Sequence, residues 1–197
     1  MAFAAIKIEE RSAATVGVIG EIPIAFRVER IFEIERRADG SIALREAPAP
    51  RPFVKDYDRI EGNAPAEWAE QFDLSNWGLL AARDRGELVG SVLIAFDTPG
   101  LDLLEGRRDL GSIWDIRVRR AARRMGVGSA LIRAAEDWSW SKGCTELKVE
   151  TQTINVGACR LYARSGFRLR DADEWAYPEF PNETQLIWTK RLTRAPA

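Results

Sequence analysis

A strand, a glycine turn and a helix follow one another in the middle of this chain, and no other segment constrains the fold as strongly. Residues 113–118 alternate in character and predict a strand. An arginine-rich turn then closes with Gly126 and Gly128, and residues 131–143 follow a helical pattern that ends in a glycine. A glycine turn that opens a helix directs backbone N–H groups and the positive end of the helix dipole at one place. Such a place can bind a phosphate or a pyrophosphate.

A second motif, from Glu150 to Phe167, follows this helix. Glu150 lies in a predicted strand, Asn155 is placed to cap a short helix, and Gly166 ends that helix. Tyr162 belongs to the same helix, and a phenol with a pKa near 10 can protonate a leaving group. The two motifs together indicate more about the chemistry than either does alone.

On spacing alone one other interpretation of the glycine turn is open, whereas two known phosphate-binding motifs do not fit. Two glycines before a helix often form only a tight entry turn. A dinucleotide fingerprint needs a third glycine where this chain has Leu131, and a phosphate-binding loop needs Lys-Ser/Thr where it has Ser129-Ala130. The neighbouring arginines could be a solvated charge run, although arginine suits pyrophosphate geometry. They are Arg117, Arg119, Arg120, Arg123 and Arg124.

The absence of histidine excludes several kinds of chemistry. None of the 197 residues is a histidine, which removes Ser-His-Asp and Cys-His nucleophiles and histidine-based metal sites, so no metal is expected. Cys144 and Cys159 lack metal-ligand spacing, and their number suits a reducing compartment. The formal net charge of −1 provides no global attraction for nucleic acid or membrane. No apolar stretch could span a bilayer and no signal peptide is apparent, which predicts a cytoplasmic protein.

Hydrophobic patterns predict hairpins ahead of the central motif and further strands after it. Residues 22–34 predict one long half-buried strand, and residues 38–41 a hairpin turn. The return strand that begins at Ile42 is expected to stop at Pro48, Pro50 and Pro52, because proline cannot donate to a ladder. The remaining expected segments are an irregular excursion (48–63), a short helix (64–72), a second hairpin (77–82 and 88–96) and strands at 147–151, 167–169 and 184–192. This order predicts one α/β domain with a mixed sheet.

The residues of the two motifs carry a resemblance to a known family. Arg123-x-x-Gly126-x-Gly128 after a strand, followed by Asn155 and Leu161-Tyr162-x-x-x-Gly166-Phe167, resembles the GCN5-related N-acetyltransferase (GNAT) family. The resemblance implies a single GNAT-like domain over residues 1–197, with a mostly antiparallel central sheet flanked by helices. Residues 112–192 would form its acetyl-CoA-binding core, and residues 1–111 its N-terminal hairpins and acceptor-side loops.

The same resemblance implies a role for each motif. The glycine turn would hold the pyrophosphate of acetyl-CoA, the strand before it would pair with the pantetheine arm, and Tyr162 would protonate the coenzyme thiolate. The residues expected to bind the cosubstrate are Ile116, Arg117, Val118, Arg123, Arg124, Met125, Gly126, Val127, Gly128, Ser129, Asn155, Ala158 and Tyr162.

A narrower resemblance points to one subgroup of the family. Asp115-Ile116-x-Val118, Glu150-Thr151-Gln152-x-Ile154-Asn155-x-x-Ala158-Cys159-x-x-Tyr162 and Tyr177-Pro178-x-Phe180-Pro181-Asn182-Glu183 resemble the streptothricin acetyltransferases. That subgroup acetylates an amine on the β-lysine arm of a cationic antibiotic, which implies a function in antibiotic resistance. The chain departs from the subgroup at Trp114, where a glutamate is usual.

Acetyl transfer to an amine requires a group that removes a proton, because an ammonium cannot attack a thioester. Asp115 and Glu150 are the available carboxylates, and each is open as base, substrate contact or structural partner. Residues 171–183 contain five acids and no Lys or Arg, and aromatic side chains there could hold a cation. The residues expected to contact the acceptor are Trp114, Asp115, Glu150, Trp175, Tyr177 and Phe180.

These observations predict an acetyl-CoA-dependent N-acetyltransferase for a small cationic amine, acting as a monomer or homodimer. A peptide or protein amine acetyltransferase and a non-catalytic CoA-binding regulatory domain are the alternatives. Nucleic-acid binding is disfavoured, because the arginines surround a glycine turn and the charge balances elsewhere.

Overall fold

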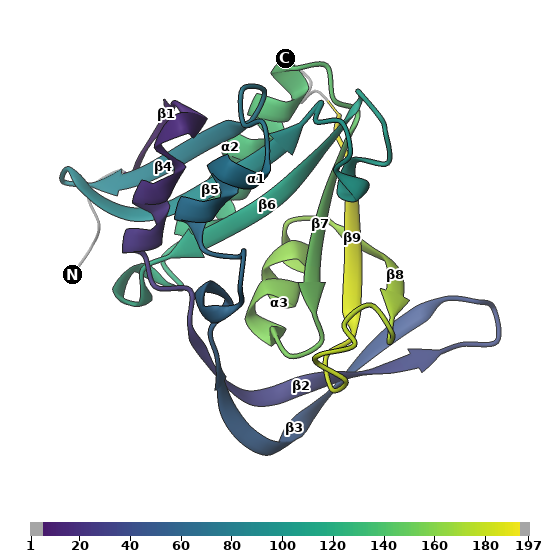
Figure 1. Ribbon diagram of the computed structural model, residues 1–197. Coiled ribbons are helices and arrows are strands. Elements are labelled where there is room, and N and C mark those ends of the chain that lie inside the picture. Colours follow the sequence, from purple (N-terminus) through teal and green to yellow (C-terminus); the bar gives the residue numbers. More distant parts are fainter. Residues whose placement is uncertain (1–5, 194–197) are drawn as a thin grey trace. The chain divides into compact units, whose positions relative to one another are not determined.

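The computed structural model describes residues 6–193, which form two compact units (Figure 1). The first unit comprises the chain up to Ile24, the segment Asp56–Leu147 and the chain from Arg191 onward. The second comprises Ala25–Lys55 and Lys148–Lys190. The chain therefore passes between the units four times.

The first unit is built on four antiparallel strands. In the order β1-β4-β5-β6 they are β1 (Lys7–Arg11), β4 (Gly78–Asp84), β5 (Glu87–Phe96) and β6 (Leu110–Val118). The near-continuous apolar run of β5 predicts a central strand, and β5 pairs with β4 on one side and β6 on the other. That expectation is confirmed.

Helices cover both faces of this part of the sheet (Figure 1). The 3₁₀ helix η1 (Ala13–Glu21) and the short elements η3 (Pro65–Glu67) and α1 (Trp68–Gln71) lie on one face, and α2 (Val127–Ser141) lies on the other. Further 3₁₀ turns are η2 (Tyr57–Arg59), η4 (Asp102–Leu104) and η5 (Arg120–Ala122). Helix α2 buries Leu131, Ala135 and Trp138 as the helical spacing predicts.

The second unit combines a long hairpin with the remaining strands. Strands β2 (Phe26–Arg36) and β3 (Ile42–Lys55) pair as a two-stranded antiparallel sheet. Strands β7 (Glu146–Gln152), β8 (Arg168–Asp173) and β9 (Gln185–Arg191) complete the seven-stranded order β1-β4-β5-β6-β7-β9-β8, and β8 and β9 are antiparallel. Helix α3 (Val156–Arg164) follows β7. The expected mixed, mostly antiparallel α/β architecture is confirmed.

The hairpin corrects the expectation that the prolines end the return strand. Strand β3 runs through all three and pairs again at Phe53, Val54 and Lys55. The N–H of Phe32 on β2 donates to Thr153 O and therefore points away from β3. N–H directions alternate along a strand, so the N–H of Arg30 also points away from β3. Pro48, which is opposite Arg30, thus lies at a position where β3 donates no hydrogen bond to β2. Residues 49–52, which include the other two prolines, face the single residue Glu29 in a bulge. The prolines thus occupy places where no ladder donor is needed, and residues 48–55 are not an irregular excursion.

The beginning of the chain also differs from the pattern-based expectation. Ile22 is the C-cap of η1 and its N–H donates to Ile19 O, so β2 starts at Phe26 and not at residue 22. Neither β1 nor η1 is indicated by hydrophobic periodicity. The hairpin turn at residues 38–41 is confirmed, with Gly40 at φ +80°.

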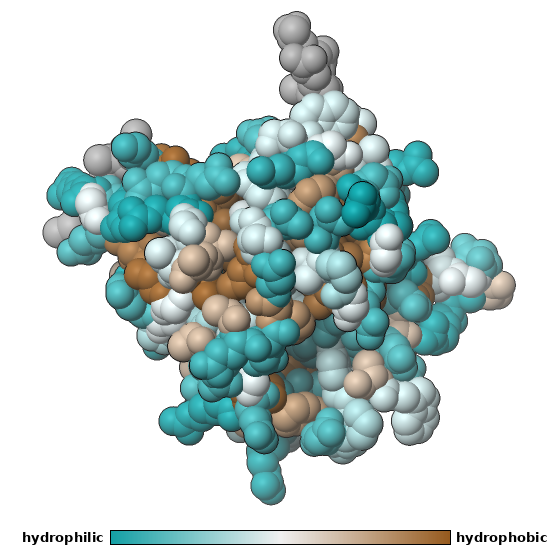
Figure 2. Space-filling view, turned by 45° about the horizontal axis from the view of Figure 1, so that its top comes forward, coloured by the Kyte–Doolittle hydropathy of each residue, from teal (hydrophilic) through white to brown (hydrophobic). Residues whose placement is uncertain are grey.

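The surface is mixed in character. Figure 2 shows one face, on which hydrophilic residues cover most of the surface and hydrophobic residues emerge in smaller patches. The exposed large hydrophobic residues are Phe53, Val54, Met125, Trp140 and Trp175. Within residues 6–193, no helix is both long and apolar enough to cross a membrane.

Candidate active site

The predicted glycine turn lies at the start of α2 in the first unit. Gly126 is the residue before the helix and adopts φ +87°, a conformation that favours glycine, and its added Cβ would meet no atom within 4 Å. The helix begins at Val127, so Gly128 lies in its first turn. The Ala130 N–H makes the first bond back to Gly126 O, which leaves the N–H groups of Val127, Gly128 and Ser129 without an acceptor in the helix.

Positive charge gathers beside these N–H groups. The Arg123 Nε donates to Val118 O at 3.0 Å, which holds this side chain next to the end of β6. Burial lowers the pKa of the Arg123 guanidinium, and so does the nearby positive charge of Arg120. Crowded cations next to a helix N-terminus are an arrangement that an anion stabilises.

Strand β6 carries backbone donors on the edge away from β5. The N–H of Arg119 donates to Val89 O of β5. Because successive N–H groups of a strand point to opposite edges, those of Ile116 and Val118 point away from β5. These are the two backbone positions at which the family resemblance implies contact with a pantetheine arm.

Trp114 occupies a bulge in the same strand. Leu93 of β5 is opposite Asp115 and Ile94 is opposite Ile113, so Trp114 has no partner across the ladder. Its ring packs in an aromatic cluster, with ring centroids 5.1–6.2 Å from those of Phe72, Trp77 and Trp68. The structure therefore gives this predicted acceptor residue a packing role in the first unit.

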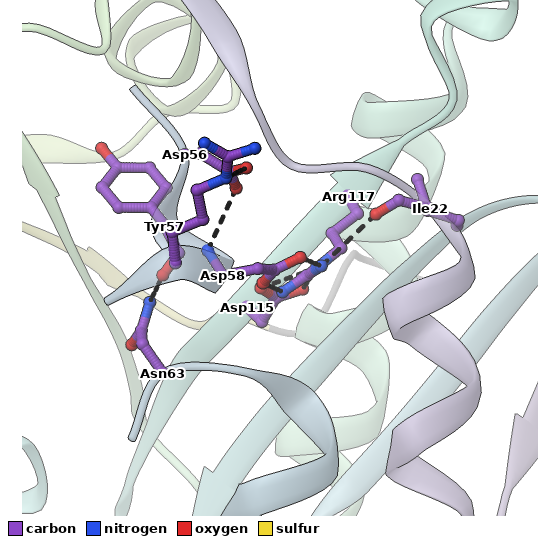
Figure 3. A network of polar contacts seen from close by, with 8 residues as sticks. Ile22, Asp56, Tyr57, Asp58, Asn63, Asp115 and Arg117 are labelled. Atoms are coloured by element: carbon purple, nitrogen blue, oxygen red, sulfur yellow. Dashed lines mark hydrogen bonds and ion pairs between the residues drawn. The ribbon is translucent and has the colours of Figure 1, made fainter. Parts of the chain in front are cut away.

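Asp115 and Arg117 form a buried network together with Asp58 (Figure 3). Asp115 and Arg117 are two residues apart in β6 and therefore lie on one face of the strand. Arg117 Nε lies 2.9 and 3.0 Å from the two Asp115 carboxylate oxygens. The other end of the guanidinium donates to both oxygens of Asp58 at 2.7 Å and to Ile22 O at 3.3 Å. Burial raises the pKa of the Asp115 carboxyl, against the opposing charge of Arg117. Both Asp115 oxygens are thus already engaged, which favours the structural-partner interpretation over that of a base.

In the second unit, Glu150 is the centre of a different polar cluster. The Tyr177 hydroxyl donates to Glu150 Oε1 and accepts a hydrogen bond from Gln152 Nε2 at 2.9 Å. Burial, and then the negative charge of Glu150, raises the pKa of the Tyr177 phenol, so the hydroxyl stays protonated and remains a donor. This arrangement orients the Glu150 carboxylate, a partly buried side chain on β7.

Helix α3 carries the predicted proton donor. Asn155 caps this helix, and its side-chain oxygen accepts from the Ala158 N–H at 3.1 Å, so the predicted cap is confirmed. Tyr162 lies on the buried face of α3 with 3% of its surface exposed, and its ring centroid is 5.8 Å from that of Phe167. The structure therefore brings Asn155, Ala158 and Tyr162 together on one short helix.

The acidic segment 171–183 is only partly a solvated loop. Trp175 is 86% exposed, and Glu174 and Glu179 are also exposed. Glu183 is buried instead and pairs with the buried Lys55 of β3, whose Nζ also lies 3.7 Å from the centroid of the Phe180 ring. Lys55, from β3, thus offsets part of the negative charge of this segment.

Lys55 and Asp58 are the residues of this region that the sequence did not single out. Lys55 is 128 residues from Glu183, and Asp58 is 59 residues from Arg117, so no local spacing links them. One indirect signal exists, since five acids without a base within thirteen residues imply a cation from outside the segment.

Three further features of the described chain bear on its chemistry. A pocket of about 620 Å³ in the first unit is lined by Glu10, Phe72, Asp73, Trp77, Phe96 and Trp138 among others, and by none of the predicted site residues. Within residues 6–193, no group of three or more Cys, Asp or Glu side chains is arranged to hold a metal ion. Burial raises the pKa of Cys159 to about 12 and that of Cys144 to about 11, which makes both thiols poor nucleophiles.

Comparison with known proteins identifies the class to which this architecture belongs. The sequence model of the acetyltransferase (GNAT) family matches residues 37–167, which is more than half of the chain. The chain therefore belongs to this family and is an acyltransferase. The family predicted from the glycine turn and the Asn155–Phe167 motif is confirmed.

Individual relatives show which members of the family this chain resembles. A streptothricin acetyltransferase of Escherichia coli is 42% identical over 168 residues, covering 83% of this chain and 83% of the relative. One of Streptomyces lavendulae is 29% identical over 153 residues, covering 78% of this chain and 76% of the relative. The crystal structure of a Bacillus anthracis str. Ames protein in complex with acetyl coenzyme A matches this chain with a TM-score of 0.74 at 21% identity. The match covers 96% of this chain and 98% of that one, and it supports the fold.

Proposed function

We propose that this protein uses acetyl-CoA to acetylate a primary amine of a small cationic acceptor of the streptothricin type. The observation that carries this proposal is the 42% identity to a streptothricin acetyltransferase over 83% of both chains. Glu174, Trp175 and Glu179 support a cationic acceptor, because they are exposed and such groups attract and stack on a cation, whereas Phe180 and Glu183 already hold Lys55.

Acetyl-CoA would bind through the two features of the first unit described above. The N-terminal N–H groups of α2, with Arg120 and Arg123 beside them, suit the pyrophosphate. The N–H groups of Ile116 and Val118, which point away from β5, suit the amide-containing pantetheine arm. One of them could also donate to the oxyanion that forms when the amine attacks the thioester carbonyl.

Proton transfers would involve the second unit. Glu150 accepts a proton from the acceptor ammonium, directly or through a water, and the neutral amine then attacks the thioester carbon. Collapse of the tetrahedral intermediate breaks the C–S bond, and the Tyr162 phenol gives its proton to the departing thiolate. The nitrogen loses its surplus proton as the amide forms, and that proton restores the Tyr162 phenol, directly or through water. Asp115 would serve the reaction indirectly, because both its oxygens are held by Arg117.

Two buried, unpaired cysteines suit a reducing compartment, and we propose a cytoplasmic, metal-independent enzyme that is a monomer or homodimer.

The direct test is an acceptor screen with detection of free coenzyme thiol. Streptothricin, polyamines and a lysine-containing peptide are each incubated with acetyl-CoA and the protein. Thiol release with streptothricin, and acetylated streptothricin in the mass spectrum, are expected. Release with the peptide alone would instead support a protein amine acetyltransferase.

Two variants assign the roles within this reaction. Tyr162→Phe keeps the ring packing and should lower kcat on the order of 10²–10⁴-fold while acetyl-CoA still raises the melting temperature. A Gly126→Asp, Gly128→Asp variant should lose the shift in melting temperature that acetyl-CoA causes in the parent protein. Full turnover in Tyr162→Phe would reject its role as proton donor, and an unchanged shift in the glycine variant would reject the pyrophosphate site.

A further inference from the structure

Residues 177–183, just before β9, form a regular structure that the sequence pattern does not predict. The Phe180 N–H donates to Tyr177 O, and the Glu183 N–H donates to Phe180 O, both at 2.9 Å. These are two successive turns, each with a proline as its second residue, where the fixed φ of proline fits. Tyr177, Phe180 and Glu183 are the partly or fully buried residues of this segment, whereas the four residues between them are exposed. The three side chains thus form one inward-facing row with a period of three.

Lys55 holds two members of this row. Its Nζ lies 2.7 and 2.9 Å from the two Glu183 carboxylate oxygens and 3.7 Å from the centroid of the Phe180 ring. The side chains of Lys55 and Glu183 are only 7% and 8% exposed, so the pair is formed away from water. A buried pair of this kind constrains its partners strongly, because either charge alone would be costly in that place.

The third member of the row contacts Glu150. The Tyr177 hydroxyl donates to Glu150 and also interacts with Gln152 and Gln185. The order of contacts is therefore Lys55 to Glu183 and Phe180, through two backbone turns to Tyr177, and from its hydroxyl to the carboxylate. Each contact lies within the second unit.

We propose that Lys55 is a positioning residue for Glu150, acting through the double turn that carries Tyr177. The inference rests on the proposed role of Glu150 as the carboxylate that takes the proton of the acceptor amine. Without the lysine, Glu183 turns toward water, the double turn moves with it, and the Tyr177 hydroxyl no longer holds Glu150. A misaligned base lowers the fraction of productive complexes, so the effect falls on kcat more than on the acceptor KM.

The first experiment measures the titration of the Tyr177 hydroxyl by NMR and does not depend on catalysis. The chain has three tyrosines, so ¹³Cζ labelling gives three ring signals, and Tyr177→Phe assigns one of them. In the parent protein this phenol is expected to titrate well above pH 10, whereas in Lys55→Met its titration should move back toward the ordinary range of tyrosine. Arg27→Met serves as the control in the same hairpin, because it breaks the exposed Arg27–Glu29 pair and should leave the signal unchanged. An unaltered Tyr177 titration in Lys55→Met would overturn the inference.

The second experiment is a double-mutant cycle in kcat. Lys55→Met and Tyr177→Phe should each lower kcat on the order of 10-fold, and the double variant should be no more than about threefold slower than either one. Multiplicative effects would show that Lys55 acts by another route and would overturn the inference. If Lys55→Met does not fold, Glu183→Gln, which removes the charge that Lys55 holds and so loosens the double turn from its other side, takes its place in both experiments.

Glu150→Gln separates failure of this inference from failure of the proposed function. If Glu150→Gln keeps full kcat, Glu150 is not the base, and the positioning role falls with it even where the Tyr177 titration moves. If Glu150→Gln is slow and Lys55→Met retains the kcat of the parent protein, the base assignment stands and the lysine has only a structural role.

Discussion

The two units of this protein differ in the contacts that stabilise each of them internally. In the first unit, β4, β5, β6, η1 and α1 contribute to a continuous apolar cluster that includes Ile19, Leu79, Leu93, Leu104 and Leu110. In the second unit, Val28, Ala49 and Ile154 form a much smaller cluster, and specific polar contacts hold its loops. Packing volume is therefore tested best in the large cluster of the first unit, whereas in the second unit particular polar contacts fix the positions of the loops.

The two units also differ in how a buried cation is used. In the first unit, the planar guanidinium of Arg117 joins three segments, namely β6, the η2 region through Asp58 and the end of η1 through Ile22 O. In the second unit, Lys55 provides a single charge to Glu183 and a cation for the face of Phe180. An arginine fork can hold several acceptors at once, whereas a lysine is a point charge.

The largest effect on stability is expected from Arg117→Met. The change leaves Asp115 and Asp58 facing each other without a cation, and loss of one partner of a buried pair costs about 3–5 kcal/mol. Urea denaturation measures the free energy of unfolding. Arg107→Met is the matched control, because Arg107 also joins two carboxylates, Asp109 and Glu146, but is 34% exposed. The control should lose no more than about 1 kcal/mol, and equal losses in both variants would contradict the importance of burial.

Gly78→Ala tests how tightly the side chains of the first unit are packed. A Cβ at Gly78 would lie 2.4 Å from Cε2 of Trp138, so β4 and α2 must separate or the indole must move. Overpacking of this kind costs about 1–3 kcal/mol. Gly17→Ala is the control, since nothing lies within 4 Å of its added Cβ. A Gly78→Ala protein as stable as the control would show that the first unit is less tightly packed than the distances indicate.

The difference between local and long-range interactions explains which parts of the fold were predictable from the sequence. The apolar run of β5, the buried stripe of α2 and the Asn155 cap are local patterns, and all three were predicted. Strand β1 was not, because Lys7–Arg11 has little apolar alternation and becomes a strand through its pairing with β4. The bulge that admits the prolines depends on the register of the hairpin as a whole.

The candidate site divides in the same way. The glycine turn and the Asn155–Tyr162 helix are continuous motifs, so their residues could be named in advance. The distant partners of Arg117 and Glu183 could not, because Asp58 and Lys55 come from remote segments. Charge excess indicates that a partner exists, but only the tertiary fold decides which residue it is.

One cysteine in each unit allows a comparison by pH. Burial raises the pKa of Cys159 to about 12 from its usual 9.0, so the native state keeps a proton that the unfolded chain loses. The free energy of unfolding should therefore fall as the pH rises from about 9 toward 12, by up to ~1.4 kcal/mol per pH unit from this thiol. Cys159→Ala should flatten this slope, measured against the parent protein. Cys144→Ala in the first unit should flatten it over a narrower range, because the pKa of Cys144 rises only to about 11. Parallel curves for all three proteins would contradict the burial of both thiols.

The smallest effect is expected from Pro50→Ala in the hairpin of the second unit. Pro50 lies in the bulge opposite Glu29, so the change neither adds nor removes a bond of the β2–β3 ladder. The loss should be only about 0.4–1 kcal/mol, which reflects the greater freedom of the unfolded chain. Ala47→Pro provides the contrast, because the alternation set by Phe32 directs the Ala47 N–H toward Ile31 and a proline there removes a ladder bond. If Pro50→Ala destabilises the protein as much as Ala47→Pro, the bulge contributes more to the second unit than its polar contacts do, and the contrast between the units must be redrawn.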